Sequence, residues 1–271
     1  MASSTLLVDG HVHFYDCYRQ AAFFAGALEN FAAAAKRLKL SHGFQGCLLM
    51  TETAQDHRFS AWRREAEDQR ANGQRAGDDG AFQKTAEDCS LTFVAPGGAS
   101  LAIVAGRQIV TAERLEVLAL GHDGEFADGL DLDDTLAAVA RSGALAAIPW
   151  AFGKWWSERG RLVAAKVAGT PASELYLGDN GGRPSCSGTP AIFKAAQKRG
   201  YVILPGSDPL PFASETARAG GYGFMLEGEW DENRPFASIK AALARRGPQL
   251  KTFGTRVGPL KFMIDQVRMR L

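Results

Sequence analysis

The chain has 271 residues, of which 46% are hydrophobic and 23% are charged, and these values are ordinary for a globular protein. Its formal net charge of +1 gives no overall field that favours nucleic acid or an acidic membrane. A local basic cluster can still bind a small anion. The sequence has no signal-peptide pattern, no run of about 18 apolar residues and no CxxC pair, which predicts a cytoplasmic protein without a membrane segment.

An apolar strand pattern at residues 6–16 (LLVDGHVHFYD) ends in two histidines that are separated by one residue, His11 and His13. Side chains two residues apart on a strand point to the same face, so both imidazoles can approach one ion. Imidazole is a common ligand for zinc, manganese and iron. The alternative is a strand end that carries two exposed histidines.

The next segments combine helical and strand patterns. An alanine-rich segment that ends in basic residues predicts a helix at 21–40, and a short apolar segment predicts a strand at 43–53. The charged segment 55–75 indicates a solvated helix. Residues 89–121 indicate three or four short strands in a β-meander.

Helices and strands alternate more regularly from residue 131 onward. The predicted helices and strands are, in order, 131–143, 144–150, 158–169, 173–180, 189–200 and 201–208. Continuous apolar strands of this kind are typical of buried parallel strands, so the pattern indicates a parallel α/β barrel or a doubly wound sheet. The tail at 258–271 predicts a packing helix, and a basic amphipathic membrane helix is the less favoured interpretation.

Six segments at predicted strand ends carry a family resemblance: DGHVH (9–13), LLMTET (48–53), AGRQIVTAERLEVLALG (105–121), SGALAAIPWAFGKW (142–155), SELYLGDNGGRP (173–184) and YVILPGSDPLPF (201–212). In order and spacing they resemble the PHP (polymerase and histidinol phosphatase) family, over residues 5 to about 225. The resemblance implies a single domain over 1–271, a distorted TIM-like (β/α)7 barrel, and metal-dependent phosphoesterase activity. DGHVH alone also fits amidohydrolases, and the frame at 105–121 favours PHP.

The resemblance assigns His11, His13 and Asp208 as metal ligands. Other ligand positions of the family are filled here by residues that differ from its pattern: Thr53, Gln108, Glu116, Ile148 and Leu210. A neutral glutamine bridges two ions poorly, and isoleucine and leucine cannot ligate, so one divalent ion of manganese, zinc or iron is expected instead of a cluster of three. Asp208 also fits a turn or helix cap, because Ser-Asp-Pro favours turns.

Further candidates follow other predicted strand ends. Glu52 is a possible fourth ligand or general base, and Asp208 also counts as catalytic. Lys154 and Trp150 are predicted to bind an anion and to stack on a ring at the barrel mouth, with aromatic packing under a loop as the alternative. Arg183 is predicted to clamp an anionic substrate, and a solvated loop arginine is the alternative.

Three functions are consistent with these residues. The first is a metal-dependent phosphoric ester hydrolase with a mononuclear site and a small anionic substrate. The second is a catalytically inactive PHP-like scaffold that binds a small anionic ligand or a partner protein. The third is an amidohydrolase-like C–N hydrolase. Net charge predicts no nucleic-acid partner, and the sequence makes no prediction of oligomeric state.

Overall fold

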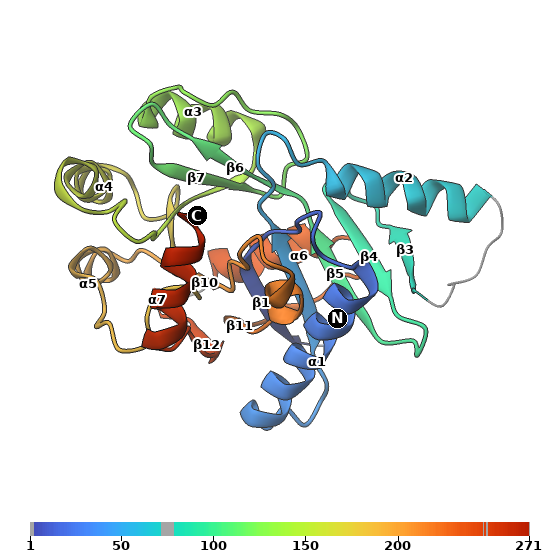
Figure 1. Cartoon of the computed structure of the whole chain (residues 1–271). Coiled ribbons are helices and arrows are strands. Elements are labelled where there is room, and N and C mark those ends of the chain that lie inside the picture. Colours follow the sequence, from blue (N-terminus) through green and yellow to red (C-terminus); the bar gives the residue numbers. More distant parts are fainter. Residues whose placement is uncertain (1–2, 72–78, 246, 248, 271) are drawn as a thin grey trace.

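The computed structural model describes residues 3–71, 79–245, 247 and 249–270, and its strands form two mixed sheets (Figure 1). The order in the first sheet is β12 (Lys251–Gly254), β11 (Tyr222–Glu229), β1 (Ser3–Val12), β2 (Gln45–Met50), β5 (Ser100–Val104), β4 (Ser90–Val94) and β3 (Ala81–Lys84). The order in the second is β10 (Ile203–Gly206), β9 (Tyr176–Asn180), β8 (Leu145–Pro149), β7 (Glu116–Leu120) and β6 (Gly106–Val110).

The predicted distorted TIM-like (β/α)7 barrel is wrong, because the strands do not close into one ring. β6 pairs antiparallel with β7, and β7 with β8, whereas a barrel of this class needs parallel neighbours with a crossover helix between them. In the part of the chain that the structure describes, the two sheets are joined between β2 and β6 by an isolated bridge, Glu52 to Arg107. The fold is therefore an α/β arrangement of two open mixed sheets.

The strands expected as a meander at 89–121 are divided between the two sheets. β4 and β5 form an antiparallel pair in the first sheet, and β6 and β7 form one in the second. The chain crosses from one sheet to the other at Ala105, which is buried. Because no helix intervenes in this segment, the chain reverses direction at each turn, and the parallel order is lost.

Helices cover the outer faces of both sheets. The predicted helices are confirmed as α1 (Gln20–Leu38), α2 (Arg58–Ala71), α3 (Leu132–Ser142), α4 (Ser157–Gly169) and α5 (Ala191–Lys198). The last part of the second predicted helix, 72–75, lies outside the described residues. α1 and α2 share an apolar core with the first sheet, and α3, α4 and α5 share another with the second. The third core contains residues of both sheets, among them Leu6 and Val8 of β1, Leu118 of β7 and Leu204 of β10.

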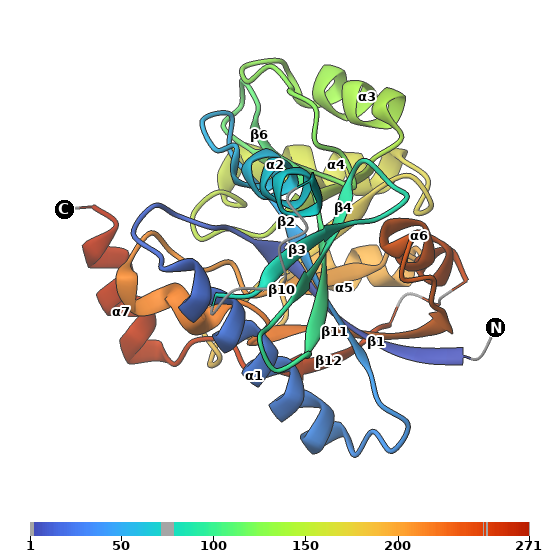
Figure 2. The same cartoon turned by 90° about the vertical axis from the view of Figure 1, so that its right-hand side faces the viewer.

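Two later helices lie on opposite sides of the molecule, α6 (Pro235–Ala244) and α7 (Pro259–Arg268) (Figure 2). α7 occupies most of the predicted tail helix, and Leu271 lies outside the described residues. Of its side chains, only Phe262 and Asp265 are buried. Lys261 pairs with Asp265 and with Glu215 of the short 3₁₀ helix η1 (Ala213–Arg218), which ties α7 to the segment after β10.

The sequence predicts no membrane segment and no paired cysteines, and the described residues bear on both. No helix among them has both the length and the apolar character needed to cross a bilayer. All four cysteines are free thiols, and of these Cys47 is buried and Cys17 and Cys186 are exposed.

Candidate metal centre

His11 and His13 lie at the carboxyl end of β1, which is held between β2 and β11 in the first sheet. Both are buried, with 4% of their surface exposed. Their Nε2 atoms are 3.0 Å apart, so the two imidazoles converge as the spacing predicted. The interpretation of two exposed histidines at a strand end is wrong.

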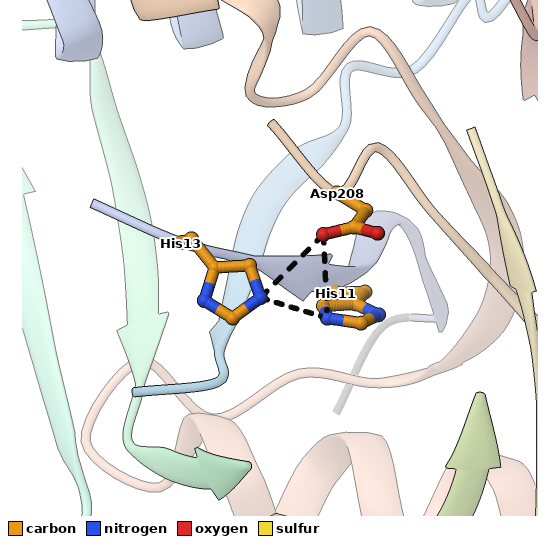
Figure 3. A group of neighbouring side chains, drawn as sticks. All are labelled: His11, His13 and Asp208. Atoms are coloured by element: carbon orange, nitrogen blue, oxygen red, sulfur yellow. Dashed lines mark hydrogen bonds and ion pairs between the residues drawn. The ribbon is translucent and has the colours of Figure 1, made fainter. Parts of the chain in front are cut away.

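Asp208 reaches the same point from the second sheet, two residues after the end of β10. Gly206 makes this approach possible, because a Cβ at that position would overlap the backbone nitrogen and the Cβ of His11. The Asp208 amide donates a hydrogen bond of 2.9 Å to the His11 carbonyl. Asp208 has a φ of 46°, a left-handed conformation that aspartate adopts more readily than most residues. The three side chains therefore meet where the two sheets join (Figure 3).

Asp9 connects the strand that carries the histidines to the loop that carries Asp208. Its carboxylate accepts hydrogen bonds from the backbone amides of His11 (3.3 Å), Ser207 (2.8 Å) and Gly220 (2.8 Å). Burial raises the pKa of Asp9 to about 6, and hydrogen bonds from Ser207, Gly220 and His11 oppose this increase. Asp9 thus fixes the relative position of the candidate ligands.

The three donor atoms have the spacing of one face of a tetrahedral site. Asp208 Oδ1 lies 3.6 Å from His11 Nε2 and 3.5 Å from His13 Nε2, with the imidazole nitrogens 3.0 Å apart. Ligand bonds of about 2.0–2.1 Å give edges of about 3.3 Å in a tetrahedron. Two imidazoles and a carboxylate suit zinc, manganese or iron, so these residues fit one divalent ion.

The electrostatics of His13 also suit a metal ligand. Burial, followed by the neighbouring His11, lowers the pKa of His13 to about 4. The imidazole is therefore neutral at pH 7, which is the form that binds a metal. The ring of Tyr15 stacks on His13, with centroids 5.5 Å apart. The Nδ1 atom of His13 has no hydrogen-bond partner among the described residues, whereas ligating histidines usually donate through this second nitrogen.

Asn180 is a further residue of the centre. Its amide donates to Asp208 Oδ2, which leaves Oδ1 directed at the histidines. Asn180 ends β9, the strand beside β10, so parallel pairing brings the two strand ends together. Sequence reasoning did not assign Asn180, although a polar residue at the end of a predicted parallel strand is a usable signal.

A recess of about 310 Å³ opens beside the centre, and both His13 and Asp208 line it. Trp150, Phe152 and Lys154 line it from the segment after β8. The ammonium of Lys154 forms an ion pair with Glu116 of β7. The structure thus brings Trp150 and Lys154, both predicted to contact substrate, to the same recess as the candidate ligands.

Glu52 lies elsewhere, in a separate cavity of about 90 Å³ that it shares with Arg107. Its carboxylate accepts a 2.7 Å hydrogen bond from the Phe59 amide in the first turn of α2 and lies 3.4 Å from the Arg107 guanidinium. Burial raises the pKa of Glu52 to about 7. These contacts favour a structural role for Glu52, and its role as ligand or base stays a prediction.

Arg183 is neither a free substrate clamp nor a solvated loop residue. Its guanidinium is buried and binds both carboxylate oxygens of Asp179, at 2.7 and 2.8 Å. Its remaining nitrogen donates to Ser187 and Gly188. The Tyr222 hydroxyl also donates to Asp179. Since its donors are satisfied inside the protein, Arg183 stabilises the fold beneath the recess instead of contacting a substrate.

Neither of the two comparisons by sequence finds a match. No protein-family model matches the chain, and no curated protein matches it. Among solved structures, PsfC from Pseudomonas syringae PB-5123 is similar with a TM-score of 0.55 and 15% identity, over 100% of this chain and 99% of that one.

Two structures of endonuclease Q are also similar. One is a complex with a 27-mer duplex substrate that has an abasic lesion at the active site, with a TM-score of 0.52 and 16% identity. The other is the lesion-specific endonuclease from Pyrococcus furiosus, with a TM-score of 0.50 and 15% identity. Both matches cover 92% of this chain but 58% of the endonuclease chains. At these identities the similarity shows a shared fold alone.

Proposed function

We propose that this protein is a metal-dependent hydrolase of phosphate esters that uses one divalent ion. The observation that carries the proposal is the convergence of His11, His13 and Asp208 at the junction of the two sheets, beside a recess. The likeness in fold to endonuclease Q and the resemblance of the strand ends to the PHP family support the same class of chemistry. DNA is not proposed as the substrate, because the net charge of +1 provides little attraction for a polyanion.

The residues of the centre have separate roles in this proposal. His11, His13 and Asp208 hold the ion, which when bound polarises a phosphoryl oxygen and lowers the pKa of a water molecule. Asn180 and Asp9 act through these ligands by fixing the Asp208 carboxylate and the β1 backbone. Lys154 places a positive charge in the recess where a phosphoryl group can enter.

Hydrolysis of p-nitrophenyl phosphate tests this function, since this aryl leaving group needs no general acid. The protein is treated with a chelator and then supplied with manganese, zinc or iron. We expect metal-dependent turnover that Asp208→Asn reduces by about 100-fold or more. The matched control is Asp16→Asn, whose side chain is 98% exposed in a surface pair with Arg58. Turnover that needs no metal, or that survives in Asp208→Asn, contradicts the proposal.

A duplex with an abasic site is the comparison substrate. Cleavage of this duplex without turnover of the aryl phosphate contradicts the preference for a small substrate and indicates a nuclease. Turnover of the aryl phosphate alone agrees with the proposal.

A ligand-binding scaffold without catalysis is the second candidate. It is favoured by the positions of Ile148, which is fully buried in the outer core of the second sheet, and of Glu116, whose carboxylate is paired with Lys154. Neither residue adds a ligand for a second ion. Binding of inorganic phosphate in a thermal-shift assay, with no turnover under any metal, distinguishes this candidate from the hydrolase.

A further inference from the structure

The recess beside the metal centre has a charged side that is held in place by ion pairs. Lys154 pairs with Glu116, and the Gln108 amide nitrogen is 3.5 Å from the same Glu116 oxygen. The ion pair with Glu116 restrains the Lys154 ammonium in the recess that His13 and Asp208 also line. Such a restrained ammonium can donate a hydrogen bond to one oxygen of a bound anion, while the other oxygens of the anion face the metal ion.

The charges that line the recess make anion binding dependent on the metal. Glu116 is paired with Lys154, and Asp265 of α7 is paired with Lys261 at 2.8 Å. Among the described carboxylates that line the recess, Asp208 alone has no lysine or arginine partner. The two positive charges of a divalent ion at the centre exceed this one negative charge. The metal-loaded recess therefore attracts an anion, and the metal-free recess does not.

Aromatic side chains also line the recess. Phe152 and Phe262 of α7 both line it and pack edge to face, with ring centroids 5.0 Å apart. Trp156 packs against Phe152 with ring centroids 4.9 Å apart, and Trp150 and Tyr15 also line the recess. Phe152 remains 39% exposed, so part of its ring is free to contact a ligand.

We infer that the recess binds a small molecule in which a planar ring carries a phosphoryl group. The phosphoryl group lies between the metal centre and Lys154, and the ring contacts Phe152 and its aromatic neighbours. The volume of about 310 Å³ is large enough for one ring with its phosphate. The inference rests on the proposed function for the presence of the ion, and it specifies the substrate class.

Phosphonates test the inference without turnover, because their P–C bond is not hydrolysed. Binding of phenylphosphonate and of methylphosphonate to manganese-loaded protein is measured by isothermal titration calorimetry. We expect phenylphosphonate to bind about fivefold more tightly, and Phe152→Ala to reduce this ratio to below about twofold. The matched control is Phe44→Ala, since Phe44 is 38% exposed and lies outside the recess. An equal affinity for both probes, or an unchanged ratio in Phe152→Ala, overturns the inference.

A lysine substitution tests the charged side. Lys154→Met is expected to weaken both phosphonates by about tenfold. Lys84→Met is the control, because Lys84 is likewise 35% exposed and pairs with a glutamate, Glu67. Removal of manganese is expected to weaken both probes by at least about tenfold. An equal effect of the two substitutions, or unchanged binding without metal, overturns the inference.

The outcomes separate this inference from the proposed function. Phosphonate binding with the expected ring preference, together with no turnover of an aryl phosphate, contradicts catalysis and leaves the substrate class intact. Metal-dependent turnover without any ring preference supports catalysis and contradicts the inferred substrate class. A failure of both probes to bind the manganese-loaded protein overturns the inference.

Discussion

Glu52 provides a test of the interpretation that this buried carboxylate is structural. In the folded protein its pKa is about 7, compared with a reference value of 4.5. Burial is the main cause, while the Phe59 amide and the Arg107 guanidinium oppose it. Because the folded state binds the proton more tightly, the contribution of Glu52 to stability is complete below about pH 4.5 and is lost as the pH rises through about 7.

The magnitude follows from the shift of the pKa. A difference of about 2.5 units corresponds to about 3 kcal/mol of unfolding free energy, since each unit is worth about 1.4 kcal/mol. Most of this change, about 2 kcal/mol or more, falls between about pH 5 and about pH 8. Glu52→Gln replaces the carboxyl by a neutral group of similar shape, so the change with pH is smaller in the variant by this amount.

Urea denaturation at these two pH values measures the effect for the wild type and for Glu52→Gln. Taking the difference between the two proteins cancels the titration of other groups, such as Asp9 and His13. Glu29→Gln is the control, because Glu29 is exposed on α1 and its substitution is expected to leave the pH dependence unchanged. A pH dependence that is equal in Glu52→Gln and wild type refutes the reasoning. Metal-dependent turnover that is lost in Glu52→Gln, with stability retained, restores Glu52 as a catalytic base.

Two other substitutions test the structure around the centre. Arg183→Met leaves the Asp179 carboxylate buried without its guanidinium partner. We expect the free energy of unfolding, measured with urea, to fall by about 3–5 kcal/mol. A decrease below about 1 kcal/mol contradicts a stabilising buried pair. Gly206→Ala forces β10 away from His11 and is expected to weaken manganese binding by about tenfold or more in calorimetry. Gly97→Ala, where a new Cβ meets nothing within 4 Å, is the control, and equal affinities in the two variants contradict the role of Gly206.

Local sequence signals predicted the described α-helices except α6, and most strands, but not how the sheets are assembled. α3 illustrates a strong signal, because Asp131 precedes the helix and its side chain accepts a hydrogen bond from the Asp134 amide, as the acidic start indicates. The direction of β6 and β7 depends on pairing with distant strands, and their apolar residues fit parallel and antiparallel neighbours equally well. The choice between a closed parallel barrel and two open mixed sheets could therefore not be made from hydrophobic periodicity.

The candidate centre was predictable where ligands follow strand ends and unpredictable where distant segments meet. His11, His13 and Asp208 follow apolar strands, and the structure brings their donor atoms within 4.8 Å of one another. Phe262 reaches the recess from α7, about fifty residues after Asp208, and no local pattern indicates that contact. Arg183 was misinterpreted because its partner, Asp179, sits at the end of a strand, where sequence does not reveal a bidentate pair.

Calorimetric titration of chelator-treated protein with manganese and with zinc tests the central claim most directly. We expect one ion to bind per chain, with an affinity that falls by about 100-fold in His11→Ala and in Asp208→Asn while Asp16→Asn behaves like the wild type. Absence of binding by either metal, or affinities in His11→Ala and Asp208→Asn equal to that of the wild type, contradicts the assignment of His11, His13 and Asp208 as a metal centre.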